Sequence, residues 1–164
     1  MPILRNGEII ENRWRDIADE EVLPAATAAV VSFQRWQNDF ASLKNSEHPL
    51  GLRITGDTHV SLIANDLQHF DLVSIAFPTI ADGRGYSQAR LVRQRYGYTG
   101  ELRATGPLVR DIFAALDRVG FDTIEARDEN EARAWSEAVG RITVRLQPDL
   151  LATKPVDRVQ TAAA

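Results

Sequence analysis

The chain has 164 residues, of which 44% are hydrophobic and 26% charged, and its formal net charge is −4. This length supports one domain, and the composition excludes wholesale disorder. The acidic balance argues against a general nucleic-acid binder. Because there is no cysteine, disulfides, thiolate metal sites and a cysteine nucleophile are excluded. No apolar run approaches the roughly 20 residues that span a bilayer, so we expect no membrane partner.

The two ends of the chain lack the patterning of the middle. Residues 1–20 carry five acidic side chains and no apolar core of a signal peptide. We therefore expect an irregular lead-in, with a short hairpin at Asn6-Gly7, and a cytoplasmic location. Residues 151–164 end in a run of alanine, and we expect a disordered tail there. The predicted α/β domain covers residues 21–150.

The first predicted elements lie between residues 24 and 70. The alanine-rich stretch 24–44 predicts a helix, and a short strand before Phe33 is an open alternative. Residues 50–55 predict a strand. Apolar residues recur at helical spacing over residues 57–70, where Asp57 is a plausible N-cap, so this segment predicts a helix.

The central elements are a strand, a helix and a second strand. Residues 72–77 are almost wholly apolar and predict a buried strand that ends at Pro78. A loop then leads to a helix predicted over residues 86–96. Residues 101–104 predict the next short strand.

The last third repeats this alternation. Gly106-Pro107 predicts the start of a helix, with proline at the first helical position, and Gly120 predicts its end. Residues 121–126 predict a strand. A helix is predicted from residue 128 to Gly140, and the alternating apolar residues 142–146 predict a final strand.

Strands are thus predicted to begin near residues 50, 72, 101, 121 and 141. This spacing is typical of successive βα units. The prediction is a single α/β domain with a mainly parallel five-stranded sheet and helices on both faces. A half-barrel is the alternative, and it would need a partner to cover its exposed edges.

Residues 82–111 concentrate positive charge in an acidic protein. They hold six arginines and three acidic side chains, for a local net charge of +3, so the other 134 residues carry −7. All six cations are arginine, whose planar guanidinium suits bidentate contact with carboxylate, phosphate or sulfate. One interpretation is a surface that binds an anion or a partner. The other is a solvated set of arginines paired with nearby acids.

Two loops of this segment are expected at one edge of the sheet. Loop 78–85 and the turn at Thr105-Gly106 each join a strand to a helix, and parallel strands place such loops at the carboxyl edge, where ligands bind in open α/β folds. Helix N-termini would add N–H donors there, and glycines would let a ligand approach the backbone. The predicted binding residues are Asp82, Gly83, Arg84, Gly85, Ser87, Arg90, Arg93, Glu101, Arg103, Thr105, Gly106 and Arg110.

Other motifs carry less information. Gly83-Arg84-Gly85 is similar to part of a dinucleotide-binding fingerprint, but Gln88 stands where the third glycine belongs. The three histidines lack metal-ligand spacing, so no metal site is predicted. Ser87 has no evident histidine partner for nucleophilic catalysis. The cofactor and any catalytic residue therefore stay unknown at this stage.

Long and specific strings fill the segment from Phe77 to Glu125. They are Phe77-Pro78, then DGRGYSQARLVRQRYGYTGELRATG, then LVRD and GFDTIE. Together with NGEIIENRW and residues 49–52 nearer the N-terminus, these strings resemble the DUF934 family of uncharacterised bacterial proteins. The resemblance covers most of residues 6–146.

The resemblance implies a role near sulfite reduction. Such proteins are commonly labelled probable oxidoreductases of sulfite reduction, because their genes lie beside those of sulfite reductase and sulfate-assimilation enzymes. The family pattern often has cysteine where this chain has Val119, so we do not expect a thiol redox mechanism. A redox reaction would need a bound cofactor or a partner to carry electrons.

Three functional hypotheses follow. The leading one is an accessory protein of assimilatory sulfite reduction, which binds sulfite reductase or a small sulfur oxyanion through its arginine-rich face. The second is a small oxidoreductase-like enzyme that acts on an oxyanion or phosphorylated substrate, with Asp82 or Glu101 as acid or base. The third is a homodimer or larger homo-oligomer with arginine ion pairs at its interface.

Overall fold

The protein is described by a computed structural model, which covers residues 1–24, 27–79 and 81–139. Its eight strands are β1 (Ile3–Arg5), β2 (Glu8–Ile10), β3 (Trp14–Asp16), β4 (Ala28–Ser32), β5 (Leu50–Thr55), β6 (Leu72–Ala76), β7 (Glu101–Thr105) and β8 (Thr123–Glu125). Its helices are α1 (Phe33–Leu43), α2 (Arg84–Arg90), α3 (Phe113–Arg118) and α4 (Glu129–Val139). The strand predicted over residues 142–146 and the tail predicted over residues 151–164 lie outside the described residues.

All eight strands form one sheet, in the order β2-β1-β8-β7-β6-β5-β4-β3. From β3 to β8 every neighbouring pair is parallel, while β1 pairs antiparallel with both β2 and β8. The α/β class and the largely parallel sheet are confirmed. The number of strands is not the predicted five.

The strands that the sequence did not count among the predicted five lie near the N-terminus. β1, β2 and β3 fall in residues 1–20, where an irregular lead-in was expected, and β4 occupies the open alternative before Phe33. These strands have three to five residues, too few for a clear alternating pattern. The hairpin at Asn6-Gly7 is confirmed, because it joins β1 to β2 with positive φ values of 52° and 82°.

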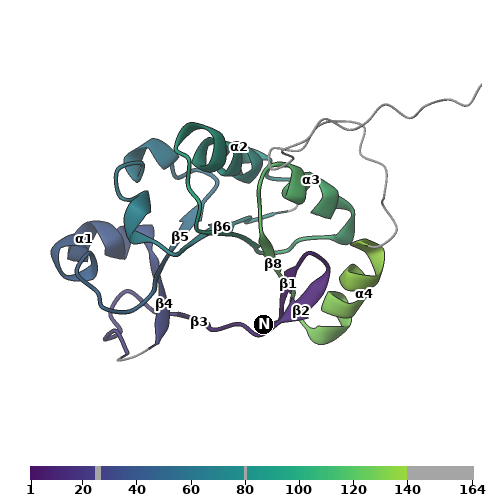
Figure 1. The fold of residues 1–164 in the computed structure, drawn as a ribbon, viewed down its shortest axis with the longest axis horizontal. Coiled ribbons are helices and arrows are strands. Elements are labelled where there is room, and N and C mark those ends of the chain that lie inside the picture. The colour runs from purple at the N-terminus through teal and green to yellow at the C-terminus, as the bar shows by residue number, and fades with distance from the viewer. Residues whose placement is uncertain (25–26, 80, 140–164) are drawn as a thin grey trace, which may run out of the picture.

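The prediction of helices on both faces is wrong. Strands β3 to β8 follow one another in chain order without a reversal. Since crossovers between parallel strands are right-handed, an unreversed order places every crossover helix on the same face. A doubly wound sheet needs a point where the order reverses, and this sheet has none. Figure 1 shows α1, α2 and α3 around the outside of the curved sheet.

The sheet curls into the half-barrel that the sequence left as an alternative. The two edge strands, β2 and β3, are joined by residues 11–13 alone. In a flat sheet of this size the edges would lie about 34 Å apart, because neighbouring strands are about 4.8 Å apart. A connection of three residues spans about 14 Å at most. The sheet must therefore curl to bring β2 and β3 close enough for this connection. Figure 1 shows this connection crossing the open side of the sheet.

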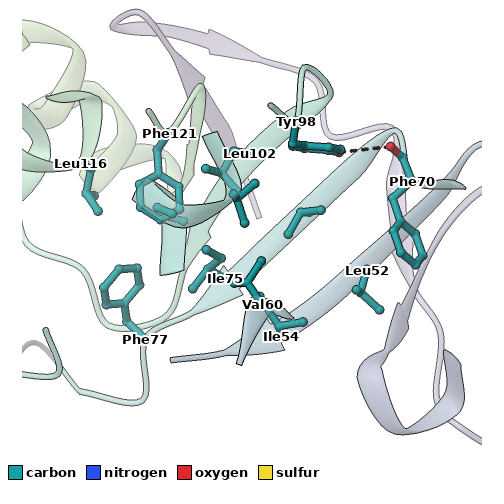
Figure 2. Close-up of a cluster of buried hydrophobic side chains, with 14 of the residues drawn as sticks. Leu52, Ile54, Val60, Phe70, Ile75, Phe77, Tyr98, Leu102, Leu116 and Phe121 are labelled. Atoms are coloured by element: carbon teal, nitrogen blue, oxygen red, sulfur yellow. Dashed lines mark hydrogen bonds between the residues drawn. The ribbon is translucent and has the colours of Figure 1, made fainter. Parts of the chain in front are cut away.

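The main core lies between the outer helices and the convex face of the sheet. Leu52, Ile75 and Leu102 on the sheet are each 0% exposed, and Trp36 and Leu116 from the helices belong to the same cluster. Figure 2 shows part of this cluster, where the Tyr98 hydroxyl donates to the Phe70 carbonyl oxygen at 3.2 Å. Burial of these side chains stabilises the layer by about 1.5–3 kcal/mol for each large residue.

The opposite, concave face of the sheet is polar over much of its area. Along β5, Leu52 and Ile54 face the core, whereas Arg53 between them faces the other way. Arg53 pairs in register with Ser74 of β6, and Ser74 with Arg103 of β7. Side chains of paired residues point to the same side of a sheet, so these three lie on the concave face.

Two predicted helices take other forms. The segment predicted as a helix over residues 57–70 contains two short 3₁₀ turns, η1 (Val60–Leu62) and η2 (Leu67–His69), although its apolar residues are buried as expected. The helix predicted from Gly106-Pro107 starts later. Val109 is extended, with φ −123° and ψ 152°, and a 3₁₀ turn, η4 (Arg110–Ile112), then leads into α3.

Candidate functional site

The loops after β6 and β7 meet at the carboxyl edge of the sheet. β6 and β7 are parallel, and both loops pack closely against Phe77. A side chain at Gly85 would lie 2.6 Å from the Phe77 ring, and one at Gly106, where φ is +110°, would clash with the Phe77 carbonyl oxygen. Because the chain packs closely on Phe77, there is no room for a side chain at either glycine. Gly83 has open space around it.

Asp82 and Arg84 form an ion pair within the first of these loops. Nη2 of Arg84 lies 2.7 Å from Oδ2 of Asp82, and Nε of Arg84 donates to the same carboxylate. These hydrogen bonds lower the pKa of Asp82 to about 2. The nearby carboxylate of Asp57, bonded by the Thr55 hydroxyl, also has a lowered pKa. Two ionised carboxylates thus share one arginine here, which does not favour a bound oxyanion.

Arg93 lies at the other end of the sheet and bonds to the chain itself. It donates to the carbonyl oxygens of Tyr98 (2.6 Å), Gly100 (2.9 Å) and Gly120 (2.9 Å), and it is ion-paired with Asp122. Its side chain is 9% exposed. These bonds connect the C-terminal end of the helical segment between β6 and β7 to the residues that precede β7 and β8.

Glu101 and Arg103 form a buried pair on the concave face. Nη2 of Arg103 lies 2.7 Å from Oε1 of Glu101, and the two side chains are 5% and 9% exposed. The Thr123 hydroxyl donates to the same carboxylate oxygen, and Arg5 bonds to the other one. Burial raises the pKa of Glu101, but the Thr123 hydrogen bond and the charges of Arg103 and Arg5 outweigh it and leave the pKa lowered. We name this cluster, with Asn12, the concave network.

The remaining predicted residues do not converge with these pairs. Thr105 is the last residue of β7 and is half-buried, whereas Ser87, Arg90 and Arg110 are exposed. The twelve predicted residues are thus divided among the carboxyl edge, the concave network, the amino edge and the outer helices. Binding by any of them stays a prediction.

Three exposed arginines lie on the segments that follow β6 and β7. Arg90 donates to Gln94, and Arg95, in the π-helical turn η3 (Leu91–Arg95), stacks over Tyr96 at 5.8 Å. Arg110 lies 3.8 Å from Asp111, and both side chains are more than half exposed. Two aliphatic neighbours, Leu91 and Val109, are each 37% exposed. We refer to Arg90, Leu91, Arg95, Val109 and Arg110, which are all exposed on these two segments, as the outer arginine surface.

A hollow of about 360 Å³ lies at the amino edge, opposite the predicted loops. Arg5, Glu101, Asp117 and Asp122 contribute to its lining. Arg5 and Glu101 bond to each other, and Asp122 is held by Arg93. Three carboxylates against one arginine do not favour an anionic ligand there.

Sequence reasoning missed the polar residues of the concave face outside residues 82–111. Arg53 bonds through Nη1 to Asp16 at 2.5 Å, and Glu125 lies within electrostatic reach of both. Burial and the charge of Asp16 raise the pKa of Glu125. The signal was present for Arg53 and Glu125, because each lies between two apolar neighbours along its strand.

Among residues 1–24, 27–79 and 81–139, no group of three potential metal ligands comes together. Within the same ranges, none of the helices has the length and apolar character needed to cross a bilayer.

The fold and these features define a curled, mainly parallel α/β half-barrel with helices outside and a polar concave face. The chain belongs to the DUF934 family, described as bacterial proteins of unknown function, because the family model matches residues 51–156, more than half of the chain. The resemblance drawn from the sequence strings is thereby confirmed. No curated protein matches the chain.

Proposed function

We propose that this protein is a non-catalytic accessory protein of assimilatory sulfite reduction that docks on an acidic surface of a sulfite reductase subunit through the outer arginine surface. The setting in sulfite reduction comes from the family resemblance. The observation that supports docking is the exposure of three arginines that have few charged partners. Arg90 donates to the Gln94 amide, Arg95 stacks over the Tyr96 ring, and Arg110 lies 3.8 Å from the Asp111 carboxylate. Their charge is therefore available to a partner.

The apolar neighbours of these arginines support a protein partner over a small anion. Leu91 follows Arg90, and Val109 precedes Arg110, so on each segment an exposed aliphatic side chain is the chain neighbour of an exposed arginine. Protein interfaces are enriched in arginine and bury apolar groups at their centres. A small oxyanion would gain nothing from the aliphatic groups.

The enzyme alternative finds less support in the predicted acid–base residues. An efficient general base has a pKa near the working pH. The pKa of Asp82 is about 2, and that of Glu101 is also lowered. Both carboxylates are held by arginines, so neither is suited to take up and release a proton near neutral pH.

The test is a pull-down from an extract of the source cells grown with sulfate as sole sulfur source. Wild-type protein and two variants serve as baits. The outer-surface variant carries Arg90→Gln, Arg95→Gln and Arg110→Gln. A matched control bait carries Arg15→Gln, Arg127→Gln and Arg133→Gln, three exposed arginines on other elements with the same change in charge.

We expect wild type and control to recover a sulfite reductase subunit, identified by mass spectrometry, and the outer-surface variant to recover about tenfold less. Equal recovery by both variants, or no reductase subunit with wild type, would overturn the proposal. Light scattering on the same proteins tests the homo-oligomer alternative, and absorbance of a bound chromophore would favour the enzyme alternative.

A further inference from the structure

A buried indole N–H group at the edge of the sheet has no acceptor. Trp14, the first residue of β3, is 6% exposed, and among the residues that the structure describes its Nε1 makes no hydrogen bond. Buried donors are normally bonded, because an N–H group withdrawn from water without an acceptor costs free energy. Moving this indole into water would remove that cost, so the buried position of Trp14 is less stable than its packing alone would make it.

Trp14 packs on the concave face, outside the main core. Its buried neighbours are Val30 and Leu72, and the three form a cluster of their own. Leu72 lies two residues before Ser74 along β6, so it faces the concave side. A Cβ at Gly51 would lie 3.0 Å from Val30 and 3.2 Å from Leu72, so these two side chains meet over that glycine. Trp14 can therefore leave its cluster while the main core on the convex face stays packed.

The segment around Trp14 is held to the sheet from one side only. We name residues 11–16, which are the connection between the sheet edges together with β3, the flap. β3 is an edge strand and pairs with β4 alone. Its two ion pairs, made by Arg15 and Asp16, join exposed side chains and contribute little to stability. Ile17 follows the flap and is anchored, because it is 1% exposed and its N–H donates to the Val30 carbonyl oxygen at 2.9 Å.

Asn12 joins the flap to the rest of the concave network. Its Oδ1 accepts hydrogen bonds from Nη1 of Arg103 at 2.9 Å and from the backbone N–H of Trp14 at 3.2 Å. Arg103 is 5% exposed and lies in the middle of the sheet. Arg13, beside Asn12, is exposed and stacks over the Trp14 ring at 5.6 Å. One side-chain amide thus holds the flap to a buried arginine, while the next residue covers the indole from outside.

We propose that the flap opens in the folded protein and uncovers the concave network, with Asn12 as its latch and Trp14 as its plug. In the closed state the flap shields Arg103 and Glu101, whose side chains are 5% and 9% exposed. In the open state Nε1 of Trp14 bonds to water, and small solutes reach the network. This proposal does not rest on the docking proposal, because no residue of the flap belongs to the outer arginine surface.

The test is hydrogen exchange of the indole N–H groups, followed by NMR on the ¹⁵N-labelled full chain. Trp36 is the internal control, because it is 1% exposed in the main core and its Nε1 donates to Asp66 at 3.0 Å. We expect the indole proton of Trp14 to exchange at least about tenfold faster than that of Trp36. Low concentrations of urea should leave the Trp14 rate unchanged, because a local opening exposes little surface, and should raise the Trp36 rate.

A variant of the latch makes the assignment specific. Asn12→Ala removes the acceptor of a charged donor, so the exchange at Trp14 should accelerate at least about tenfold. Asn45→Ala, the same substitution at an exposed position after α1, should leave that rate unchanged. Modification by phenylglyoxal, located by peptide mass spectrometry, should accelerate at Arg103 in Asn12→Ala. Arg93, which is also buried but belongs to another network, should react as in wild type.

The proposal is overturned if Trp14 exchanges no faster than Trp36, or if urea accelerates both to the same degree. It is also overturned if Asn12→Ala leaves either the exchange at Trp14 or the modification of Arg103 unchanged. If Asn12→Ala does not fold, the comparison of the two tryptophans in wild type decides alone. These measurements use no partner protein, so a negative result would leave the docking proposal intact, and a failed pull-down would leave the flap intact.

Discussion

Nη1 of Arg103, in the middle of the sheet, donates a hydrogen bond of 2.9 Å to Oδ1 of Asn12, in the connection that joins the two sheet edges. The two residues are 91 positions apart in the chain. Arg103 also bonds to Glu101, so one buried side chain links the connection to the concave network. The curl of the sheet is thus fixed by side chains as well as by the short connection.

The Glu101→Gln variant tests this network. It leaves the buried Arg103 without its charge partner, and removing one member of a buried ion pair destabilises a protein by about 3–5 kcal/mol. We expect a loss of that size in urea unfolding followed by circular dichroism. The control is Glu129→Gln, whose pair with Arg133 is exposed and contributes at most about 1 kcal/mol. Similar small losses in both variants would contradict a structural role for the network.

Gly106→Ala should destabilise the protein, because the backbone there has φ +110° and a Cβ would clash with the Phe77 carbonyl oxygen. The strained backbone alone costs about 1–3 kcal/mol. Gly83→Ala is the matched control, since its φ is −76° and nothing lies within 4 Å of a Cβ. We expect Gly83→Ala to stabilise by about 0.4–1 kcal/mol. Thermal unfolding of the two variants gives the comparison, and equal melting temperatures would refute this packing argument.

Glu125→Gln should raise stability at neutral pH. Burial and the charge of Asp16 raise the pKa of Glu125 above its ordinary value of 4.5, while Arg103, the N-terminal amine and Arg53 oppose the shift. The folded state therefore holds this proton more tightly than the unfolded state, so stability falls as the pH rises through the folded pKa. Melting temperatures of variant and wild type should converge near pH 4 and separate toward pH 7. A variant that is less stable than wild type at pH 7 would contradict the assignment.

Arg93→Lys should destabilise the protein although it keeps the charge. Lysine cannot reproduce the fork that reaches three carbonyl oxygens and Asp122 together. Each hydrogen bond to a charged group contributes about 1.5–3 kcal/mol, so we expect a loss of at least that size in urea unfolding. Arg95→Lys, at an exposed position over Tyr96, should change stability by less than about 0.5 kcal/mol. Equal effects of the two substitutions would show that the carbonyl contacts are unimportant.

Much of the central fold could be predicted from the sequence. The strand predicted over residues 50–55 matches β5, and those predicted from 72 and 101 match the starts of β6 and β7. β6 is mostly apolar, and β5 and β7 place apolar residues at alternate positions, and both patterns are strong local signals of a strand. β1, β2 and β3 have three residues each, and only the local β1–β2 hairpin had a sequence signal, whereas β1 also pairs with β8, more than 100 residues away.

The one-sided arrangement of helices was also present in the sequence. A strand covered by helices on both faces is apolar throughout, whereas Arg53 alternates with Leu52 and Ile54, and Arg103 with Leu102 and Ala104. This alternation predicts one polar face. The prediction instead followed the regular βα spacing, which is the same whether the helices cover one face of the sheet or both.

The site could be predicted only in part. Proximity in sequence grouped Arg84, Arg93 and Arg103, but the structure places them at the carboxyl edge, the amino edge and the concave face. Arg53 and Ser74 lie outside the arginine-rich segment, and only strand register brings them together. Register is a property of paired strands, so a search along the chain does not reveal it.

The number of residues in the connection 11–13 determines how strongly the sheet is curled. Surface loops generally accept insertions without harm to the fold. Here each added residue would let the edge strands separate by up to about 3.6 Å, which would flatten the sheet and widen the concave face. A longer connection would therefore open the concave face, while the helical side of the molecule could stay unchanged.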